Sequence, residues 1–500
     1  MQHSGRKRCD PDKRTANAFP KCGSPGLSHI CNVAGLSICM KSLRLNARYN
    51  SASFRTLAAC VLSVVLTSWP ALAGDDVLIG ALRWDNWTSK SPEVKVLAQP
   101  EWKDRVPFFA RYDEQGHLTI SGDMDNVLTA EVAYAYSAGI DYFVFGFYPE
   151  TGSWGRNVTE SLSLNRALAT YLRLKDRKGI RFAVSLNQSF PEQDVADISE
   201  SIAAFVTDKG YVRTANGSAP LFVFTQNPKG WGAVYGSDEA ARRVVQQIKK
   251  RVYEKSGVNL LFILEYPDPA VAAEQARNTG MDMASAYSTF APPRPGEHVF
   301  SDCVANNSNY WGRATSAGFP FVPNVTLGWD PRPRDSVRVR DGKEPQVKSW
   351  CDPPRDNNLK QLLQSAFHAV ASQPGPLPFR SVLVYAWNEF TEGGWLAPTW
   401  NGGTAKLDEF RKATGRNRTI DRVTITWPDV AKSDRCPVRT GERDRKEVLQ
   451  QCSRNVEVSE VPRWPCPPGM RSSEDRVRAP TGLEALYWSG LWIERTCIGG

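Results

Sequence analysis

Short apolar runs alternate with amphipathic stretches along most of the chain. Eight runs predict strands, and most are continuously apolar, which is typical of parallel strands that are covered on both faces. These runs are Val77–Leu82, Asp141–Phe147, Arg181–Leu186, Leu221–Thr225, Asn259–Leu264, Asp282–Tyr287, Phe321–Thr326 and Ser381–Trp387. Helical spacing of apolar residues predicts helices between several of them, at Asn126–Ser137, Ser163–Lys175, Asp194–Asp208, Asp238–Lys255 and Asn358–Ala371.

This alternation predicts parallel β/α units. Eight strands at this spacing favour a closed (β/α)₈ TIM barrel of the α/β class, and a doubly wound sheet is the alternative fold. The chain contains neither a glycine-rich dinucleotide loop nor a Walker sequence, which favours the barrel. Residues 288–320 and 327–357 are expected to be long loops on the C-terminal face, where barrel active sites are built.

The N-terminal segment differs in charge from the rest of the chain. Residues 1–73 contain ten Lys/Arg and two Asp/Glu, which leaves 52 basic and 51 acidic residues out of 62 and 53. Because the remainder is nearly neutral, charge gives no indication of nucleic-acid binding.

Residues 40–73 are expected to be a signal peptide. Basic residues precede an apolar run, Leu57–Leu66, that is too short to span a bilayer, and Ala71-Leu72-Ala73 matches a cleavage site. Residues 1–39 are then an unstructured upstream extension. We expect a secreted or periplasmic protein that starts at Gly74 and is not stably inserted in a membrane.

Cysteine usage agrees with export. Six cysteines follow residue 73, and an even number in an exported chain predicts disulfides. Cys303 and Cys351 fall in the two long loops and are predicted to pair. The other four lie in 426–500, a segment that we expect to be a disulfide-stapled appendix to a 74–425 barrel, with three connectivities open. Its aromatic residues either bind sugar or fold back onto the barrel. The cysteine and histidine spacing predicts no metal site.

The strongest chemical signal follows the last predicted strand, in the segment 386–396, AWNEFTEGGWL. Glu389 and Glu392 lie three residues apart in a turn at the strand end, so both side chains can face one mouth of the barrel. Glycosidic cleavage needs two carboxyl groups, one to protonate the leaving oxygen and one to assist at the sugar. Crowding also separates their pKa values. The alternative is a helix cap followed by a solvated glutamate, but the strand-end position and the flanking aromatic residues favour the catalytic interpretation.

Two motifs carry a family resemblance. Asn388-Glu389-Phe390-Thr391-Glu392-Gly393 resembles the Asn-Glu-aromatic-x-Glu-Gly motif of glycoside hydrolase family 99-like barrels, which include endo-α-mannosidases and a group of polysaccharide glycosyltransferases. Gly328-Trp329-Asp330-Pro331-Arg332 resembles a segment that those barrels carry after strand seven, and here Arg332 and Arg334 compete for the arginine position. Family 71 α-1,3-glucanases have a similar turn with Asp at the first acidic position, so Glu389 favours family 99.

The resemblance implies retaining hydrolysis of an α-linked glycan without a cofactor. Glu389 would act as the base on the sugar 2-hydroxyl, through a 1,2-anhydro sugar, and Glu392 as the acid and then the base that activates water.

Residues at the other strand ends are candidates for substrate binding, because aromatic faces stack on sugars and polar groups hold hydroxyls. With the motif residues, the predicted substrate-binding set is Trp84, Asp85, Tyr148, Asn187, Glu265, Tyr287, Trp329, Asp330, Arg332, Trp387, Asn388 and Trp395. Barrel-rim packing is the alternative for each.

Three functions remain open from the sequence. The first is an exported glycoside hydrolase that acts on an oligo- or polysaccharide, mannan-like or bacterial. The second is a glycosyltransferase of polysaccharide assembly on the same barrel, which the export signal disfavours. The third is a non-catalytic glycan-binding barrel, which has no need for both glutamates.

Overall fold

The computed structural model describes residues 76–499, except 89–90, 113–116, 150–157, 188–189, 226, 228, 290, 341, 355–356, 429–463 and 482–490. The predicted signal peptide, the upstream extension, Cys436 and Cys452 lie outside the described residues. The described residues belong to one compact unit, 70–500.

All eight predicted strands form one parallel sheet, in the order β10-β12-β1-β4-β5-β6-β7-β8. A parallel bridge between Ala284 in β8 and Phe321, ahead of β10, joins the two ends of this sheet. The sheet therefore closes into the predicted TIM barrel. Its strands are β1 (Leu78–Arg83), β4 (Tyr142–Phe147), β5 (Arg181–Asn187), β6 (Ala219–Phe224), β7 (Leu260–Glu265), β8 (Met283–Ser285), β10 (Asn324–Thr326) and β12 (Ser381–Tyr385).

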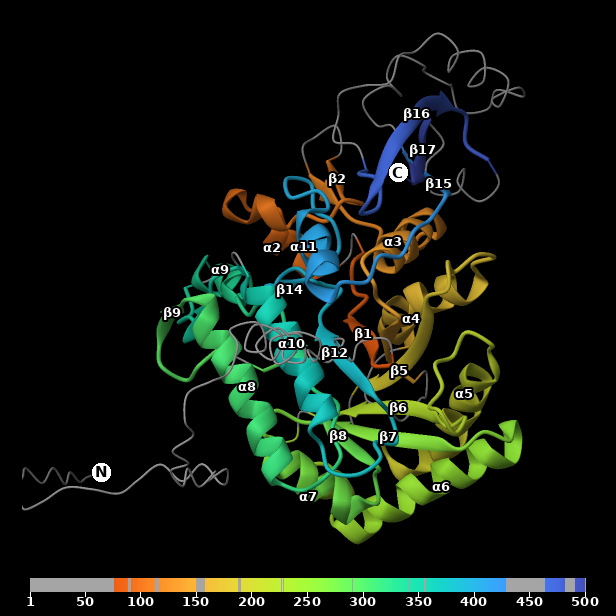
Figure 1. The fold of residues 1–500 in the computed structure, drawn as a ribbon, viewed down its shortest axis with the longest axis vertical. Helices are drawn as coiled ribbons and strands as arrows, with labels where there is room; N and C mark the ends of the chain where they lie inside the picture. Colours follow the sequence, from red (N-terminus) through yellow and green to blue (C-terminus); the bar gives the residue numbers. More distant parts are fainter. Residues whose placement is uncertain are drawn as a thin grey trace, which may run out of the picture. The chain divides into compact units, whose positions relative to one another are not determined.

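Helices surround the barrel strands (Figure 1). They bury apolar faces against the sheet, which is why parallel strands of this kind are apolar on both sides. The outer helices are α3 (Asp125–Ser137), α4 (Val158–Arg173), α5 (Val195–Thr207), α6 (Asp238–Ser256), α7 (Pro269–Thr279), α8 (Phe300–Ser316), α10 (Asn358–Ala371) and α11 (Ala405–Thr414). Among the described residues, no helix has the length and apolarity that crossing a membrane requires.

The two segments expected to be long loops contain regular structure instead. Residues 288–320 include β9 (Gly296–His298) and helix α8, and residues 327–357 include α9 (Arg332–Arg340) and β11 (Ser349–Cys351). The two short strands pair in parallel, and the predicted disulfide Cys303–Cys351 joins α8 to β11. The sequence did not predict α8 because residues 300–316 combine apolar positions with many Asn and Ser residues, which have low helix propensity.

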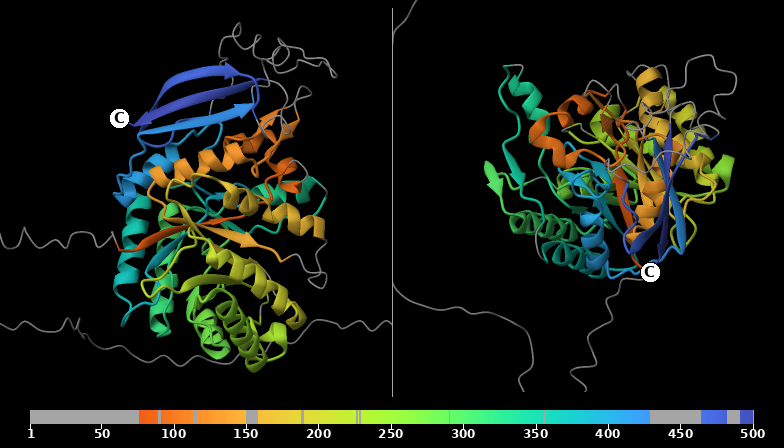
Figure 2. Two further views of the ribbon diagram at one scale, coloured as in Figure 1. Left: turned by 90° about the vertical axis from the view of Figure 1, so that its right-hand side faces the viewer. Right: turned by 90° about the horizontal axis from the view of Figure 1, so that it is seen from above.

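A three-stranded antiparallel sheet follows the barrel (Figure 2). It consists of β15 (Arg422–Pro428), β17 (Trp492–Gly499) and β16 (Met470–Arg478), so its first strand crosses the expected boundary after residue 425. Cys466 and Cys497 form a disulfide. Trp464 stacks on Trp427 at 5.8 Å and meets Phe108 edge-on at 4.8 Å. The described part of the appendix therefore folds back onto the barrel.

The remaining short elements each lie between a barrel strand (β1, β5, β6 or β12) and the main helix that follows it. They are α2 (Pro92–Leu97), β2 (Arg111–Tyr112), β3 (Leu118–Thr119), β13 (Asn388–Glu389), β14 (Gly394–Trp395) and the 3₁₀ helices Pro100–Arg105, Glu192–Asp194 and Gly232–Tyr235.

A buried aspartate ties the start of β4 to its neighbour β1. Asp141 accepts a hydrogen bond from the Ile79 backbone N at 2.6 Å and forms ion pairs with Arg416 and Arg418. Its side chain is only 8% exposed. The same device recurs ahead of β8 with less burial, because Asp282 accepts from the Phe262 backbone N at 2.7 Å and pairs with Lys249 while 35% exposed.

We predict that Asp141→Asn destabilises the protein more than Asp282→Asn. The first change leaves two guanidinium groups in a largely buried site without their carboxylate partner, and it should lower the free energy of unfolding by about 3 kcal/mol. The second removes a partly exposed pair and should cost about 1 kcal/mol. Urea unfolding of both variants measures this, and equal losses would contradict the role given to burial.

Candidate active site

Glu389 is buried at the C-terminal mouth of the barrel, just beyond β12. It is 2% exposed, and its Oε1 accepts a hydrogen bond from the Tyr287 hydroxyl at 2.6 Å. Its Oε2 has no hydrogen-bond partner among the described residues. Tyr287 follows β8, so the two sequence-predicted residues meet although 102 positions separate them.

Glu392 lies beside it with two donors. The Tyr385 hydroxyl donates to Oε2, and the Arg334 guanidinium donates through Nη1 to Oε1. The carboxyl side chain is 12% exposed, so it is more accessible than Glu389. The two glutamates therefore belong to one turn, and both side chains lie at the mouth of the barrel, as the motif predicts.

Arg334, in the first turn of α9, contacts both carboxyl groups. Its Nη2 lies 3.6 Å from Glu389 Oε2, and its Nε donates to Thr391 Oγ1 at 3.1 Å. The side chain is 39% exposed and lies 5.9 Å from the ring centroid of Trp84. Of the two arginines that compete in the motif, Arg334 is thus the one that reaches the glutamate pair.

The surroundings of Glu389 favour its neutral form. Burial raises the pKa of Glu389 to about 8 from an ordinary value of 4.5, and the nearby Glu392 adds to this effect. Arg334 and the hydrogen bond from Tyr287 act in the opposite direction and lower the pKa of Glu389. The raised pKa of Glu389 therefore favours its protonated form at neutral pH.

Glycines allow the two motif segments to touch backbone to backbone. The Asp330 N donates to the Glu392 carbonyl O at 2.6 Å. A Cβ on Gly328 would lie 2.6 Å from the Gly393 O, and a Cβ on Gly393 would lie 2.5 Å from the Asp330 N. Gly393 also has a φ of +87°, a conformation that side chains disfavour. No other residue fits at these two positions without moving the backbone.

Asp330 and Arg332 form an ion-pair cluster at the rim. Arg332 donates to Asp330 through Nε at 2.7 Å and Nη2 at 2.9 Å, and Arg105 pairs with the same carboxylate. Arg332 also stacks on Trp350 at 4.4 Å. These partners hold the pKa of the buried Asp330 below its ordinary value despite desolvation. The cluster links α9 to the segment before β2, and Asp330 is 6% exposed.

A buried network supports the motif from β1. The Asn388 side chain accepts from the Trp84 N at 2.9 Å and donates to Asp85 at 3.1 Å. Asp85 also pairs with Arg83 at 2.8 Å. Asp85 and Asn388 are 7% and 1% exposed, so in this structure they orient the strand ends and do not form an open surface.

Trp387 belongs to the same network. It is fully buried, and its Nε1 donates to Glu131 at 2.9 Å, while Glu131 pairs with Arg83 at 2.8 Å. The indole is therefore enclosed in this structure, and its ring lies 5.1 Å from that of Phe143 in β4. Its strand-end position predicts substrate contact, and in this structure the side chain supports the turn that carries Glu389.

A second cluster of polar side chains comes from β4, β5 and β7 and the residues at their ends. Asn187 Nδ2 donates to the Tyr148 hydroxyl at 3.1 Å, and Ser185 Oγ donates to Glu265 Oε2 at 2.7 Å. Glu265 is fully buried, and desolvation raises its pKa to about 7. These predicted residues thus gather inside the barrel, with Tyr148 near enough to Tyr287 to influence its ionisation.

Two predicted tryptophans are partly exposed. Trp329 packs on the Cys303–Cys351 disulfide and on Tyr385, whose ring centroid is 6.0 Å away. Trp395 contacts Phe390, and the Arg105 guanidinium and the Lys406 amino group lie over its ring. With Trp84 and Tyr287, these side chains are the predicted aromatic residues that retain exposed surface near the glutamates.

Sequence reasoning missed Tyr385. It was read as part of an apolar strand, yet its hydroxyl binds Glu392. The available signal was its position at the end of the strand, where alternate side chains point into the barrel. The predicted set includes Arg332 and not Arg334, although both fit the arginine position of the motif.

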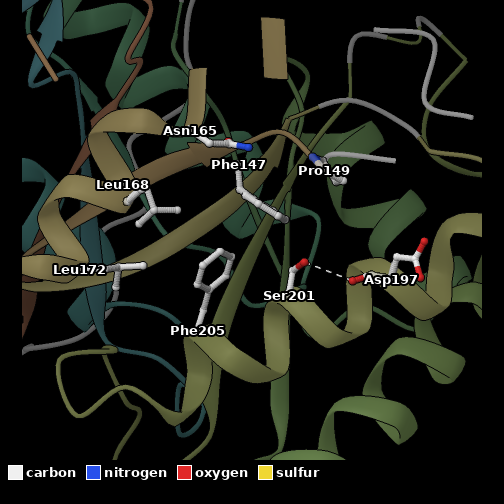
Figure 3. Close-up of a pocket in the computed structure, with 9 residues that line it drawn as sticks. Phe147, Pro149, Asn165, Leu168, Leu172, Asp197, Ser201 and Phe205 are labelled. Atoms are coloured by element: carbon white, nitrogen blue, oxygen red, sulfur yellow. Dashed lines mark hydrogen bonds between the residues drawn. The ribbon is translucent and has the colours of Figure 1, made fainter. Parts of the chain in front are cut away.

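A separate cavity of about 310 Å³ lies between α4 and α5, as Figure 3 shows. It is lined mostly by apolar side chains, including Phe147, Leu168, Leu172 and Phe205. None of the glutamate-site residues lines it. Within the part of the chain that the structure describes, no group of three or more His, Cys, Asp and Glu side chains is arranged to hold a metal ion.

No family model and no curated protein matches the chain. Among solved structures, it is similar to a GH99 endo-alpha-mannosidase from Bacteroides thetaiotaomicron at 14% identity and a TM-score of 0.40, over 68% of this chain and 99% of that one. It is also similar to a chitinase from the same organism, with 9% sequence identity and a TM-score of 0.35 over 68% of this chain and 96% of that one. A beta-glucosidase from Thermotoga maritima has 12% sequence identity and a TM-score of 0.36 over 68% of this chain and 97% of that one. These three neighbours are glycoside hydrolases.

We predict that Glu389 makes the protein less stable as pH rises from 4.5 to 8. In this window the unfolded chain ionises Glu389 and the folded chain keeps it protonated, so the unfolding free energy falls with pH. The loss should be on the order of a few kcal/mol. Denaturant unfolding of wild type and Glu389→Gln at pH 5 and 8 measures it, because the variant lacks this component. Parallel pH dependence in the two proteins would contradict the raised pKa.

Proposed function

We propose that this protein is an exported glycoside hydrolase that cleaves an α-linked glycan with retention, using Glu389 and Glu392. The observation that carries the proposal is the pair itself. One carboxyl group is buried with its pKa raised to about 8, and the other is ion-paired at the same mouth of the barrel. Two carboxyl groups with separated proton affinities are what acid–base cleavage of a glycosidic bond requires.

The arrangement around the pair supports a carbohydrate substrate. Trp84, Trp329 and Trp395 retain exposed aromatic surface, on which a pyranose ring can stack. Arg332 and Asp330 at the rim offer donors and acceptors for hydroxyl groups. Substrate contact by these residues is part of the proposal, as is contact by Tyr148, Asn187 and Glu265 once a ligand opens the site.

The roles of the two glutamates follow the family resemblance. Glu389 would take the proton of the sugar 2-hydroxyl while Glu392 protonates the leaving oxygen, and Glu392 would then activate the water that opens the 1,2-anhydro sugar. Mannan-like and bacterial polysaccharides are the proposed substrate class. The disulfides Cys303–Cys351 and Cys466–Cys497 support an oxidising compartment, outside the cell or in the periplasm.

We predict that the protein releases oligosaccharides from at least one glycan in a panel of α-mannans, α-glucans and bacterial exopolysaccharides. Replacing Glu392 with Gln keeps the shape of the side chain and removes its acid–base capacity. This variant, and Glu389→Gln, should therefore lose activity by roughly 100-fold or more. Product release measured by chromatography tests the prediction, and the anomer released first reports retention.

Both variants should still retain the glycan, because the aromatic surfaces are unchanged. Asp282→Asn, on the opposite end of the barrel strands, is a control for the effect of a lost carboxylate on folding. If wild type and both Gln variants retain one glycan equally and none releases product, the protein is a binding module and the hydrolase proposal fails.

A further inference from the structure

One cation touches both carboxyl groups of the proposed site. Arg334 Nη1 binds Glu392 Oε1, and Nη2 lies 3.6 Å from Glu389 Oε2. Its Nε is held by Thr391 at 3.1 Å, between the two glutamates in sequence. A planar guanidinium offers donors in a fixed fork, so these three contacts fix its orientation across the pair.

The contacts of the two glutamates are unequal. Glu392 accepts a donor on each oxygen, from Arg334 and from Tyr385. Glu389 accepts one hydrogen bond, from Tyr287, and its second oxygen is buried without a hydrogen-bond partner among the described residues. A carboxylate anion is stabilised by donors on both oxygens and destabilised by burial, so the negative charge is better placed on Glu392.

We infer that Arg334 is a positioning residue that holds the negative charge of the pair on Glu392 and leaves the shared proton on Glu389 in the free protein. The titration of Glu389 also depends on the other groups that face it. These are Glu392 and Tyr385 from the β12 side, Tyr287 from β8, Arg334 from α9 and Glu93 from α2. Among them Arg334 is the cation, and it lowers the pKa of Glu389 while the carboxylates raise it.

This resting arrangement is the reverse of the one that the retaining scheme uses when the glycosidic bond breaks. That scheme needs the proton on Glu392 and the charge on Glu389. One proton must therefore pass from Glu389 to Glu392 after substrate arrives, with no change in the net charge of the pair. Arg334, whose side chain is 39% exposed at the mouth, is the group that has to shift its contact from Glu392 to Glu389.

The direct experiment is a carboxyl ¹³C NMR titration of the full chain labelled at glutamate, with signals assigned through Glu389→Gln and Glu392→Gln. In wild type at neutral pH we expect the shift of a neutral acid at residue 389 and of an anion at residue 392. In Arg334→Met the proton should be less confined to residue 389, so the signal of residue 392 should move towards that of a neutral acid, because the guanidinium donor at Glu392 Oε1 is gone. Arg334→Lys, which keeps the positive charge, should move the carboxyl signals part of the way back to their wild-type behaviour.

Arg332→Met is the matched control for the titration. It removes a guanidinium two residues away in the same turn of α9, but one that contacts Asp330. Glu389 should titrate in this variant as in wild type. The inference is overturned if the proton lies on Glu392 at neutral pH in wild type, or if Arg334→Met leaves the titration of Glu389 unchanged.

A kinetic readout rests on the proposed function. The alkaline limb of kcat/KM reports loss of the shared proton from the free enzyme. In Arg334→Met this limb should move to higher pH. Near pH 9 the fraction of its maximal kcat/KM that the variant retains should then be about tenfold larger than the fraction that wild type retains. A raised KM with an unmoved limb would show that Arg334 serves only to bind sugar and would overturn the inference. If no variant cleaves any glycan, the proposed function fails, and the NMR titration alone decides the role of Arg334.

Discussion

The site depends on the close approach of two backbone segments at the ends of β10 and β12. Gly328 and Gly393 leave no room for a Cβ between them, and the Asp330 N binds the Glu392 carbonyl O at 2.6 Å. This contact sets where α9 begins relative to the glutamate turn. Because Arg334 lies in the first turn of α9, the same contact determines that its guanidinium reaches Glu392. The glycines of both motifs therefore help to determine where the positive charge of Arg334 lies relative to the glutamates.

Beneath this contact, buried ion pairs hold the turn in place. Arg83 pairs with Asp85 and Glu131, and through Asn388 and Trp387 these carboxylates bind both residues that precede Glu389. Buried pairs contribute little net stability because desolvation offsets their attraction, but losing one partner is costly. Such a network suits a requirement for one fixed geometry, since any displacement of the turn would leave a charge unpaired. Trp387, Asp85 and Asn388, which the sequence also predicts to contact substrate, belong to this network.

The sequence predicted the barrel and the glutamate pair because both depend on short-range patterns. Continuous apolar runs identify strands covered on two faces, and strand ends identify the mouth. It did not identify Tyr385, whose neighbours in an apolar strand conceal a hydroxyl that points into the barrel. Nor did it decide which of Arg332 and Arg334 contacts the pair. That choice depends on the direction in which α9 leaves β10, and this direction is fixed by a contact between segments some 60 residues apart.

The burial of Glu389 is a liability for the fold. Its Oε2 lies in a desolvated position without a hydrogen-bond partner among the described residues, and such atoms are rare in proteins unless they serve a function. The protein limits this cost by keeping Glu389 neutral and placing the negative charge beside a guanidinium on Glu392. This oxygen lies 3.6 Å from Arg334 Nη2 and can still accept a hydrogen bond from a hydroxyl group that enters the mouth. A site selected for stability alone would have an amide or an apolar residue at position 389, so the retained acid is itself an argument for chemistry at this turn.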